Sequence, residues 1–139
     1  MFVLDTNVVS ELRKARAGKA HPGVAAWASS IPAGQLFLSA ITLHELEHGV
    51  LLAEGNDPTQ GAVLRQWLDV SVTEAFRTLV LAFDEVVARR AATLHVPDPA
   101  RFRDALIGAT ALVNRMAVAT RNEKDFERFD DLDVVNPWR

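Results

Sequence analysis

The sequence predicts an α/β domain in which a parallel β-sheet is covered by helices on both faces. Short apolar runs alternate along the chain with longer amphipathic stretches, and this alternation is typical of strands joined by helical crossovers. The short runs are apolar throughout, as in strands whose two faces are both buried. Together these two observations indicate parallel strands between two helical layers.

Each element follows from its local pattern. We expect strands at residues 2–4 (FVL), 36–40 (LFLSA), 78–83 (TLVLAF), 117–120 (AVAT) and 133–136 (DVVN). Amphipathic patterns predict helices at residues 7–16, 21–31, 42–54, 59–73, 84–95 and 101–115. The segments EGNDPTQG and HVPDPA interrupt these patterns as turns and do not resemble interdomain linkers. We therefore expect residues 1–139 to form a single domain.

Composition limits the classes of function. The chain has 139 residues, no cysteine and a formal net charge of −3, so disulfides and thiolate metal sites are excluded and a passive, basic nucleic-acid coat protein is disfavoured. An acidic residue at the fifth position and the shortness of the apolar run ALIGATALV predict a protein without a signal peptide or membrane span. A soluble, cytoplasmic protein is the expectation.

Four acidic residues occupy the places where the reactive groups of a parallel sheet are found. Asp5 directly follows the first strand, and Asp125 follows the fourth. Glu45 is expected in the first turn of the helix after the second strand, and Asp104 in the first turn of the helix before the fourth. Because active sites of such sheets lie at the carboxyl ends of the strands, the four carboxylates are expected to converge. Hard oxygen ligands select Mg²⁺ or Mn²⁺ over Zn²⁺.

Each acid also has a purely structural interpretation. Asp5 suits a helix N-cap, and Thr42 with Glu45 fits a capping box. Asp104 suits the positive end of a helix dipole. Gly108, one turn beyond Asp104, either leaves room beside that carboxylate or allows close helix packing.

The segment HELEH at residues 44–48 matches the H-E-x-x-H pattern of zinc metalloproteases. The longer form of that motif fails, because no histidine follows His48 until His95. We therefore interpret His44 and His48 as polar residues that flank the acidic site, with a zinc protease as an alternative. A second alternative is a phosphoacceptor or ligand-binding module in which Asp84, after the third strand, takes the place of a receiver aspartate; Asp84 is equally suited to be an N-cap.

Five segments, in the right order along nearly the whole chain, carry a more specific resemblance: LDTN, LHELEHG, DALIGATA, ATRNEKDF and the ending NPW. They resemble the PIN-domain ribonucleases, particularly the VapC and FitB toxins. The resemblance implies a three-layer α/β/α fold with a five-stranded parallel sheet in the order 3-2-1-4-5. It also implies an acidic metal site of Asp5, Glu45, Asp104 and Asp125, supported by Thr6, Thr120 and Asn122. Gly108 departs from the alanine that is common in the family.

The expected activity is Mg²⁺- or Mn²⁺-dependent hydrolysis of RNA phosphodiester bonds. Cations beside the site are candidates for contacts with RNA phosphates; they are Arg13, Lys14, Arg16, Arg121 and Lys124.

Partners are expected mainly from the resemblance. It implies a homodimer that binds a small DNA-binding antitoxin, and an arginine of such an inhibitor would compete with metal for the acids. The helices at residues 42–54 and 59–73 carry more apolar bulk than the core needs, and a groove between them suits an amphipathic partner segment. The residues expected there are Leu51, Leu52, Leu64, Trp67 and Leu68.

Overall fold

The computed structural model describes all residues from Met1 to Arg139. Its centre is a five-stranded parallel sheet in the order β3-β2-β1-β4-β5. The strands are β1 (Phe2–Leu4), β2 (Leu36–Ser39), β3 (Val80–Leu81), β4 (Ala117–Ala119) and β5 (Val134–Val135). The strand order and the parallel direction of every pair confirm the fold predicted from the sequence.

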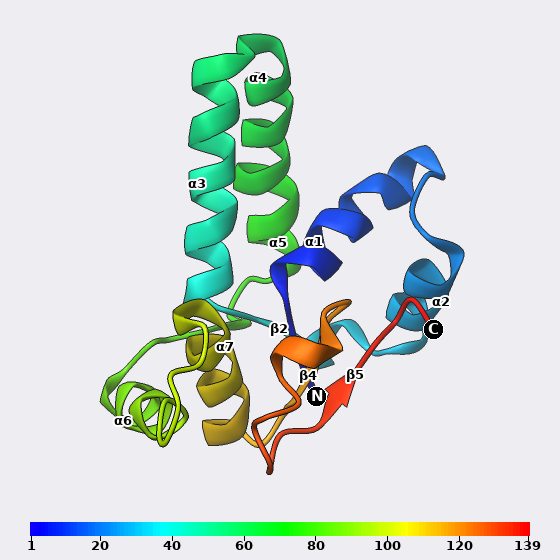
Figure 1. Ribbon diagram of the computed structural model, residues 1–139. Helices are drawn as coiled ribbons and strands as arrows, with labels where there is room; N and C mark the ends of the chain where they lie inside the picture. The colour runs from blue at the N-terminus through cyan, green and yellow to red at the C-terminus, as the bar shows by residue number, and fades with distance from the viewer.

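Helices cover both faces of this sheet and account for the expected α/β/α layers (Figure 1). The principal ones are α1 (Thr6–Arg13), α2 (Pro22–Ser30), α3 (Ala40–Asn56), α4 (Pro58–Gln66), α6 (Glu85–Thr93) and α7 (Phe102–Val113). Shorter helical segments are η1 (Lys14–Ala17), η2 (Ala33–Gln35), the π-helical η3 (Trp67–Val72), α5 (Thr73–Ala75) and η4 (Glu123–Asp125). The helix expected at 59–73 is therefore α4 continued through η3. No helix in the structure is both long and apolar enough to cross a membrane.

The hydrophobic core is divided by the sheet. Val3 and Val118 face one side, where they pack with Ile107 of α7 and Phe126. Leu4 and Ala119, the next residues along the same strands, belong to the opposite cluster with α1, α2, α3 and η3. This alternation follows from the two-residue period of a strand, and it explains why successive residues of β1 and β4 are both apolar.

The α3–α4 hairpin projects away from the sheet in Figure 1. The two helices approach closely at Gly61, where an added Cβ would lie 2.5 Å from Glu54 Cα. Beside this contact, Arg65 of α4 forms ion pairs with Glu47 and Glu54 of α3 and with Asp69 of η3. The hairpin is thus stabilised by the close helix contact at Gly61 and by the ion pairs of Arg65.

Candidate functional site

Asp5 lies at the junction of β1 and α1, at the carboxyl end of the central strand. It is fully buried, and its Oδ1 caps α1 by accepting the Thr6 N–H at 2.8 Å. Because β4 pairs with β1, Thr120 lies beside it and its hydroxyl donates to Asp5 Oδ2 at 2.8 Å. Asp5 is thus both a helix cap and a buried carboxylate of the site. Each carboxylate oxygen can accept more than one hydrogen bond, so Asp5 can bind further partners.

Glu45 reaches the site from α3. Ser39 caps this helix, which begins at Ala40, two residues earlier than expected from the sequence. Glu45 therefore lies in the second turn. The predicted capping box between Thr42 and Glu45 is wrong, because Thr42 lies inside the helix and Ser39, whose Oγ accepts the Thr42 N–H, is the N-cap. The Glu45 side chain is free to turn toward β1, where the Thr6 hydroxyl donates to its Oε1 at 2.7 Å.

Asp104 lies in the first turn of α7, as predicted, and is 2% exposed. Burial raises its pKa above the usual value, and the negative charges of Asp125 and Asp5 act in the same direction while Arg103 opposes them. A buried carboxylate near other carboxylates is costly to ionise unless a cation accompanies it. A buried carboxylate whose pKa is raised by neighbouring acids is expected where a cation binds.

Asp125 belongs to η4, just after β4, and its side chain is 25% exposed. Its Oδ2 lies 3.7 Å from Arg101 Nη1, and it is close enough to Asp104 to raise the pKa of that residue. The structure therefore brings all four predicted acids to the carboxyl end of β1 and β4.

Arg103 occupies the middle of this acidic cluster and was not among the residues predicted from the sequence. Its guanidinium donates hydrogen bonds to Asp5, to Glu45 and, at 2.6 Å, to Asp104 Oδ1. Burial by itself would lower the pKa of Arg103, but the charges of Asp5, Glu45 and Asp104 raise it. An arginine next to Asp104 in the sequence gives no sign of this role, because adjacent residues of a helix point in different directions.

The donor set fits a hard divalent cation, since it consists of carboxylate oxygens and hydroxyl groups. The arrangement differs from a ready-made site, because no group of three His, Cys, Asp or Glu side chains is placed to hold one ion. The Arg103 guanidinium instead contacts the carboxylate oxygens of these acids.

The supporting polar residues differ in how they contribute. Thr6 and Thr120 orient acidic side chains through their hydroxyls, as described above. Asn122 takes part through its backbone: its N–H donates to Thr120 Oγ1 at 3.0 Å, and its carbonyl accepts the Asp125 N–H at 3.1 Å. Asn7 was not among the predicted site residues, yet its side-chain amide lies 3.4 Å from both Asp5 Oδ2 and Thr120 Oγ1. Its position two residues after a strand-end aspartate was the available signal.

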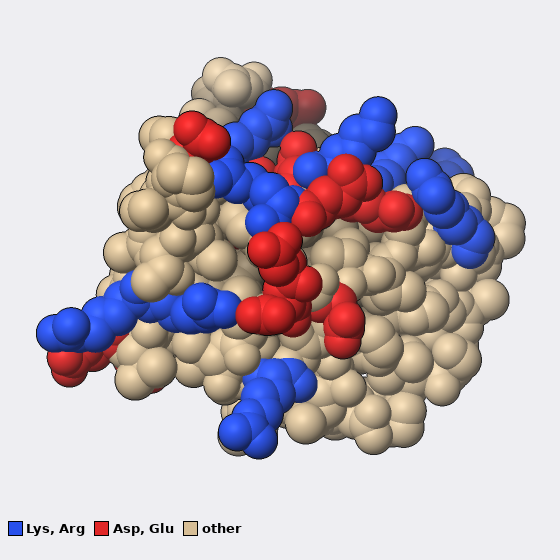
Figure 2. All heavy atoms as spheres, turned by 60° about the horizontal axis from the view of Figure 1, so that its bottom comes forward, with Lys and Arg blue, Asp and Glu red and all other residues tan.

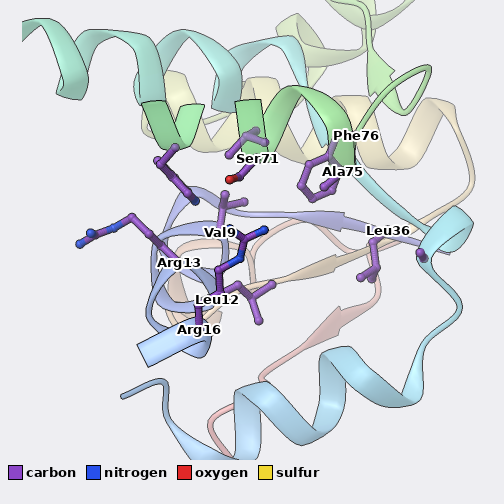
Figure 3. Close-up of a pocket in the computed structure, with 11 residues that line it drawn as sticks. Val9, Leu12, Arg13, Arg16, Leu36, Ser71, Ala75 and Phe76 are labelled. Carbon is purple, nitrogen blue, oxygen red and sulfur yellow. The ribbon is translucent and has the colours of Figure 1, made fainter. Parts of the chain in front are cut away.

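The predicted RNA-binding cations lie in two groups. Arg13 and Arg16 line an apolar cavity of about 290 Å³ between α1 and η3–α5 (Figure 3), and the Arg13 Cζ lies 5.9 Å from the centre of the Trp67 ring. Lys14 pairs with Glu11 at 3.4 Å.

The second group follows β4. Arg121 lies over Trp138, at 5.4 Å from the ring centre, and Lys124 is exposed on η4. Figure 2 shows a band of acidic side chains with Lys and Arg on both sides of it, so the face in view is not uniformly basic.

The structure does not supply the residues that a zinc protease or a phosphoacceptor module would need. The rings of His44 and His48 are exposed on α3 with centres 6.3 Å apart, and no third side chain joins them in a metal-binding group. Asp84 caps α6, with its Oδ1 accepting the Val87 N–H at 3.0 Å. Gly108 is used for close packing, because an added Cβ would lie 3.1 Å from Phe129 Cδ2.

Comparisons with known proteins agree with this geometry. The family model described as the PIN domain matches residues 2–132. A VapC ribonuclease of Sinorhizobium fredii is 37% identical over 99% of this chain and 98% of its own length, and the toxin FitB of Neisseria gonorrhoeae is 37% identical over 99% of both chains. The structure of FitAB bound to a DNA fragment superposes with a TM-score of 0.88 at 33% identity, covering 100% of this chain and 96% of that one. The chain belongs to the PIN-domain family.

Proposed function

We propose that this protein is a divalent-metal-dependent ribonuclease that acts as the toxin of a toxin–antitoxin pair, with residues 1–139 forming one PIN domain. The observation that carries the proposal is the convergence of Asp5, Glu45, Asp104 and Asp125 from four separate segments onto one end of the sheet. The alignment of nearly the whole chain with a VapC ribonuclease and a FitB toxin supports the same activity.

The four carboxylates would supply oxygen ligands to Mg²⁺ or Mn²⁺, which when bound activates water and neutralises charge on a scissile phosphate. The Thr120 hydroxyl and the Thr6 N–H hold the two oxygens of Asp5 in fixed directions. The Thr6 hydroxyl holds Glu45 in the same way. The protein thus orients its acids before any ligand arrives, which reduces the reorganisation that binding requires.

Asp5→Asn tests the proposed activity, because it keeps the size of the side chain and removes its charge. We expect purified parent protein with Mg²⁺ to cleave total cellular RNA at defined sites, which sequencing of the new ends would map. The Asn variant should fold, judged by circular dichroism, and give none of these ends. Cleavage by Asp5→Asn at the parent rate would show that the acidic site is not the nuclease site.

Metal dependence has its own test. After chelation, added Mg²⁺ or Mn²⁺ should restore RNA cleavage and Zn²⁺ should not, because the proposed ligands are all oxygens. Zinc-dependent proteolysis by the same preparation would instead support the HELEH alternative.

An antitoxin is the proposed partner, and the surface beside the acidic site suits an amphipathic segment. The cavity in Figure 3 is lined mainly by apolar residues, including Leu12, Leu36 and Phe76. A second cavity of about 290 Å³ extends from Thr6 and Glu45 and shares Arg13 and Trp67 with the first. The two cavities are therefore neighbours, and the second includes the acidic residue Glu45.

The groove expected from the sequence is only partly present. Leu51 and Leu52 are exposed and Leu64 lines the second cavity, but Leu68 is 3% exposed and belongs to the core. Trp67 lines both cavities. Apolar side chains in these cavities would give an amphipathic helix the anchors that it needs.

Co-expression with the small open reading frame beside the gene tests the partner. Co-purification of both chains and loss of RNA cleavage are expected, and the inhibition should weaken as Mg²⁺ rises if a partner arginine competes for the acids. Failure to co-purify would contradict the partner, whereas inhibition that is indifferent to Mg²⁺ would contradict only the arginine mechanism.

A further inference from the structure

Arg103 satisfies three acids at once. Its Nη2 contacts Asp5, its Nε contacts Glu45, and its Nη1 lies 2.6 Å from Asp104 Oδ1. The acids come from the end of β1, from α3 and from α7, so one guanidinium ties three elements together. The planar fork of arginine can donate in several directions simultaneously, which a lysine ammonium at the same distance does less well.

The oxygens that Arg103 occupies are those that a divalent cation would need. Asp5 Oδ1 already accepts from Thr6 and Arg103, and Asp5 Oδ2 accepts from Thr120. In this arrangement no three acidic side chains are placed to hold one ion. The guanidinium and a metal ion therefore exclude each other.

From this exclusivity we infer that Arg103 is a built-in competitor for the metal, and the inference rests on the proposed metal-dependent function. In the metal-free protein Arg103 neutralises part of the charge of the buried acids and keeps them assembled. Metal binds only when Arg103 withdraws, so the apparent metal affinity is reduced by the fraction of molecules in which the guanidinium is in place.

The position of Arg103 allows this withdrawal. It is the second residue of α7, next to the loop that precedes the helix, and its side chain is 35% exposed. It can therefore turn into solvent by side-chain rotation, without unfolding of α7. Charge also favours the exchange, since three carboxylates and one guanidinium leave −3 + 1 = −2 at the site, and a divalent cation compensates more of the −3 than a guanidinium does.

Direct binding of Mn²⁺, measured by isothermal titration calorimetry without RNA, tests the inference. Arg103→Gln should bind Mn²⁺ about tenfold more tightly than the parent if the guanidinium occupies the site in roughly nine molecules of ten. Arg103→Lys keeps the charge but cannot span three acids, so it should fold readily and should also bind Mn²⁺ more tightly than the parent.

Arg101→Gln is the matched control. It removes the same charge at the rim, where Arg101 is 80% exposed and 3.7 Å from Asp125, but it does not clear the centre of the site. Its affinity for Mn²⁺ should stay within about threefold of the parent, because exposed charges are screened by water and salt.

Thermal unfolding gives an independent readout. Without metal, Arg103→Gln should melt below the parent, since three acids lose their counter-ion. Saturating Mn²⁺ should then raise its melting temperature more than it raises that of the parent, in which the ion only replaces the guanidinium.

Each outcome decides the matter. Equal Mn²⁺ affinities of the parent and both Arg103 variants would overturn the competition and leave the proposed metal site standing. An Arg101→Gln effect as large as that of Arg103→Gln would also overturn it, because net charge alone would explain the change. Absence of Mn²⁺ binding in all four proteins would overturn both the competition and the metal site.

Discussion

Two arginines of this protein each bridge three acids, and the surroundings of the two clusters differ. Arg65 pairs with Glu47, Glu54 and Asp69 on the outside of the α3–α4 hairpin, where the acidic side chains are 38% to 58% exposed. Arg103 pairs with Asp5, Glu45 and Asp104 at the end of the sheet, where Asp5 and Asp104 are buried.

The same ion pairing has opposite electrostatic results in the two places. The hydrogen bonds from Arg65 lower the pKa values of Glu47 and Glu54, and the paired arginine has a raised pKa. At the other cluster, burial raises the pKa of Asp104 despite the adjacent guanidinium. The acids of the hairpin cluster stay solvated, so their ionisation has little desolvation cost and the ion pairs link α3 to α4. At the buried cluster, the single charge of Arg103 does not offset the cost of removing the Asp104 carboxylate from water.

The largest expected difference is in activity. Asp104→Asn should reduce the rate of RNA cleavage at least about 100-fold, equivalent to about 2.7 kcal/mol of transition-state stabilisation. Asp69→Asn makes the same chemical change in the hairpin cluster and should leave the rate unaltered. Single-turnover cleavage with saturating Mg²⁺ measures both, and equal losses would remove the functional distinction between the clusters.

The next effect concerns stability of the hairpin. Gly61→Ala places a Cβ against the backbone of Glu54, so the helices must separate, at a cost of about 1–3 kcal/mol. Gly49→Ala in α3 is the control, because its Cβ would meet nothing within 4 Å, and it should stabilise the protein by up to about 1 kcal/mol. Urea denaturation measures both; destabilisation by both would contradict the close contact as the specific cause, because helix propensity favours alanine over glycine at both positions.

Stability should depend on pH in opposite ways for the two clusters. The pKa of Glu47 is below 4.5 in the folded protein, so its stabilising contribution is present above pH 4.5 and disappears as the pH falls through the folded value. The pKa of Asp104 is above 3.8 in the folded protein, so its ionisation becomes unfavourable to folding as the pH rises from 3.8 through the folded value.

Relative to the parent, Glu47→Gln should therefore lose stability between pH 3 and pH 7, and Asp104→Asn should gain it. Urea denaturation at a series of pH values gives the two slopes, and slopes of the same sign would refute the assigned pKa directions.

The smallest effect is the response to salt. Arg65→Gln should lower the melting temperature slightly at low ionic strength, and the difference should vanish near 1 M salt, where charges are screened over about 3 Å. In the metal-free protein the loss caused by Arg103→Gln should persist at that salt, because its partners are buried. A persistent Arg65 effect would mean that the guanidinium stabilises the hairpin by packing.

The sequence by itself determined the fold class and, through its family resemblance, the strand order, and it predicted the four acids that the structure brings to one end of the sheet. Apolar runs such as FVL mark a buried strand because its two faces both contact helices, and Asp5 is marked by its place directly after that strand. These patterns involve only neighbouring residues of the chain, so they can be recognised in the sequence alone.

Only the tertiary structure decided what lies between the acids. Ser39, and not Thr42, caps α3, and this shift of two residues at the helix start places Glu45 in the second turn. Asn7 and Arg103 enter the site through contacts with residues 113, 98 and 58 positions away in the chain. Likewise, Leu68 is buried while Leu51 and Leu52 are exposed, although all three are leucines on amphipathic helices. Partners so distant in the chain leave no local pattern, because their proximity exists only after the sheet has brought the ends of its strands together.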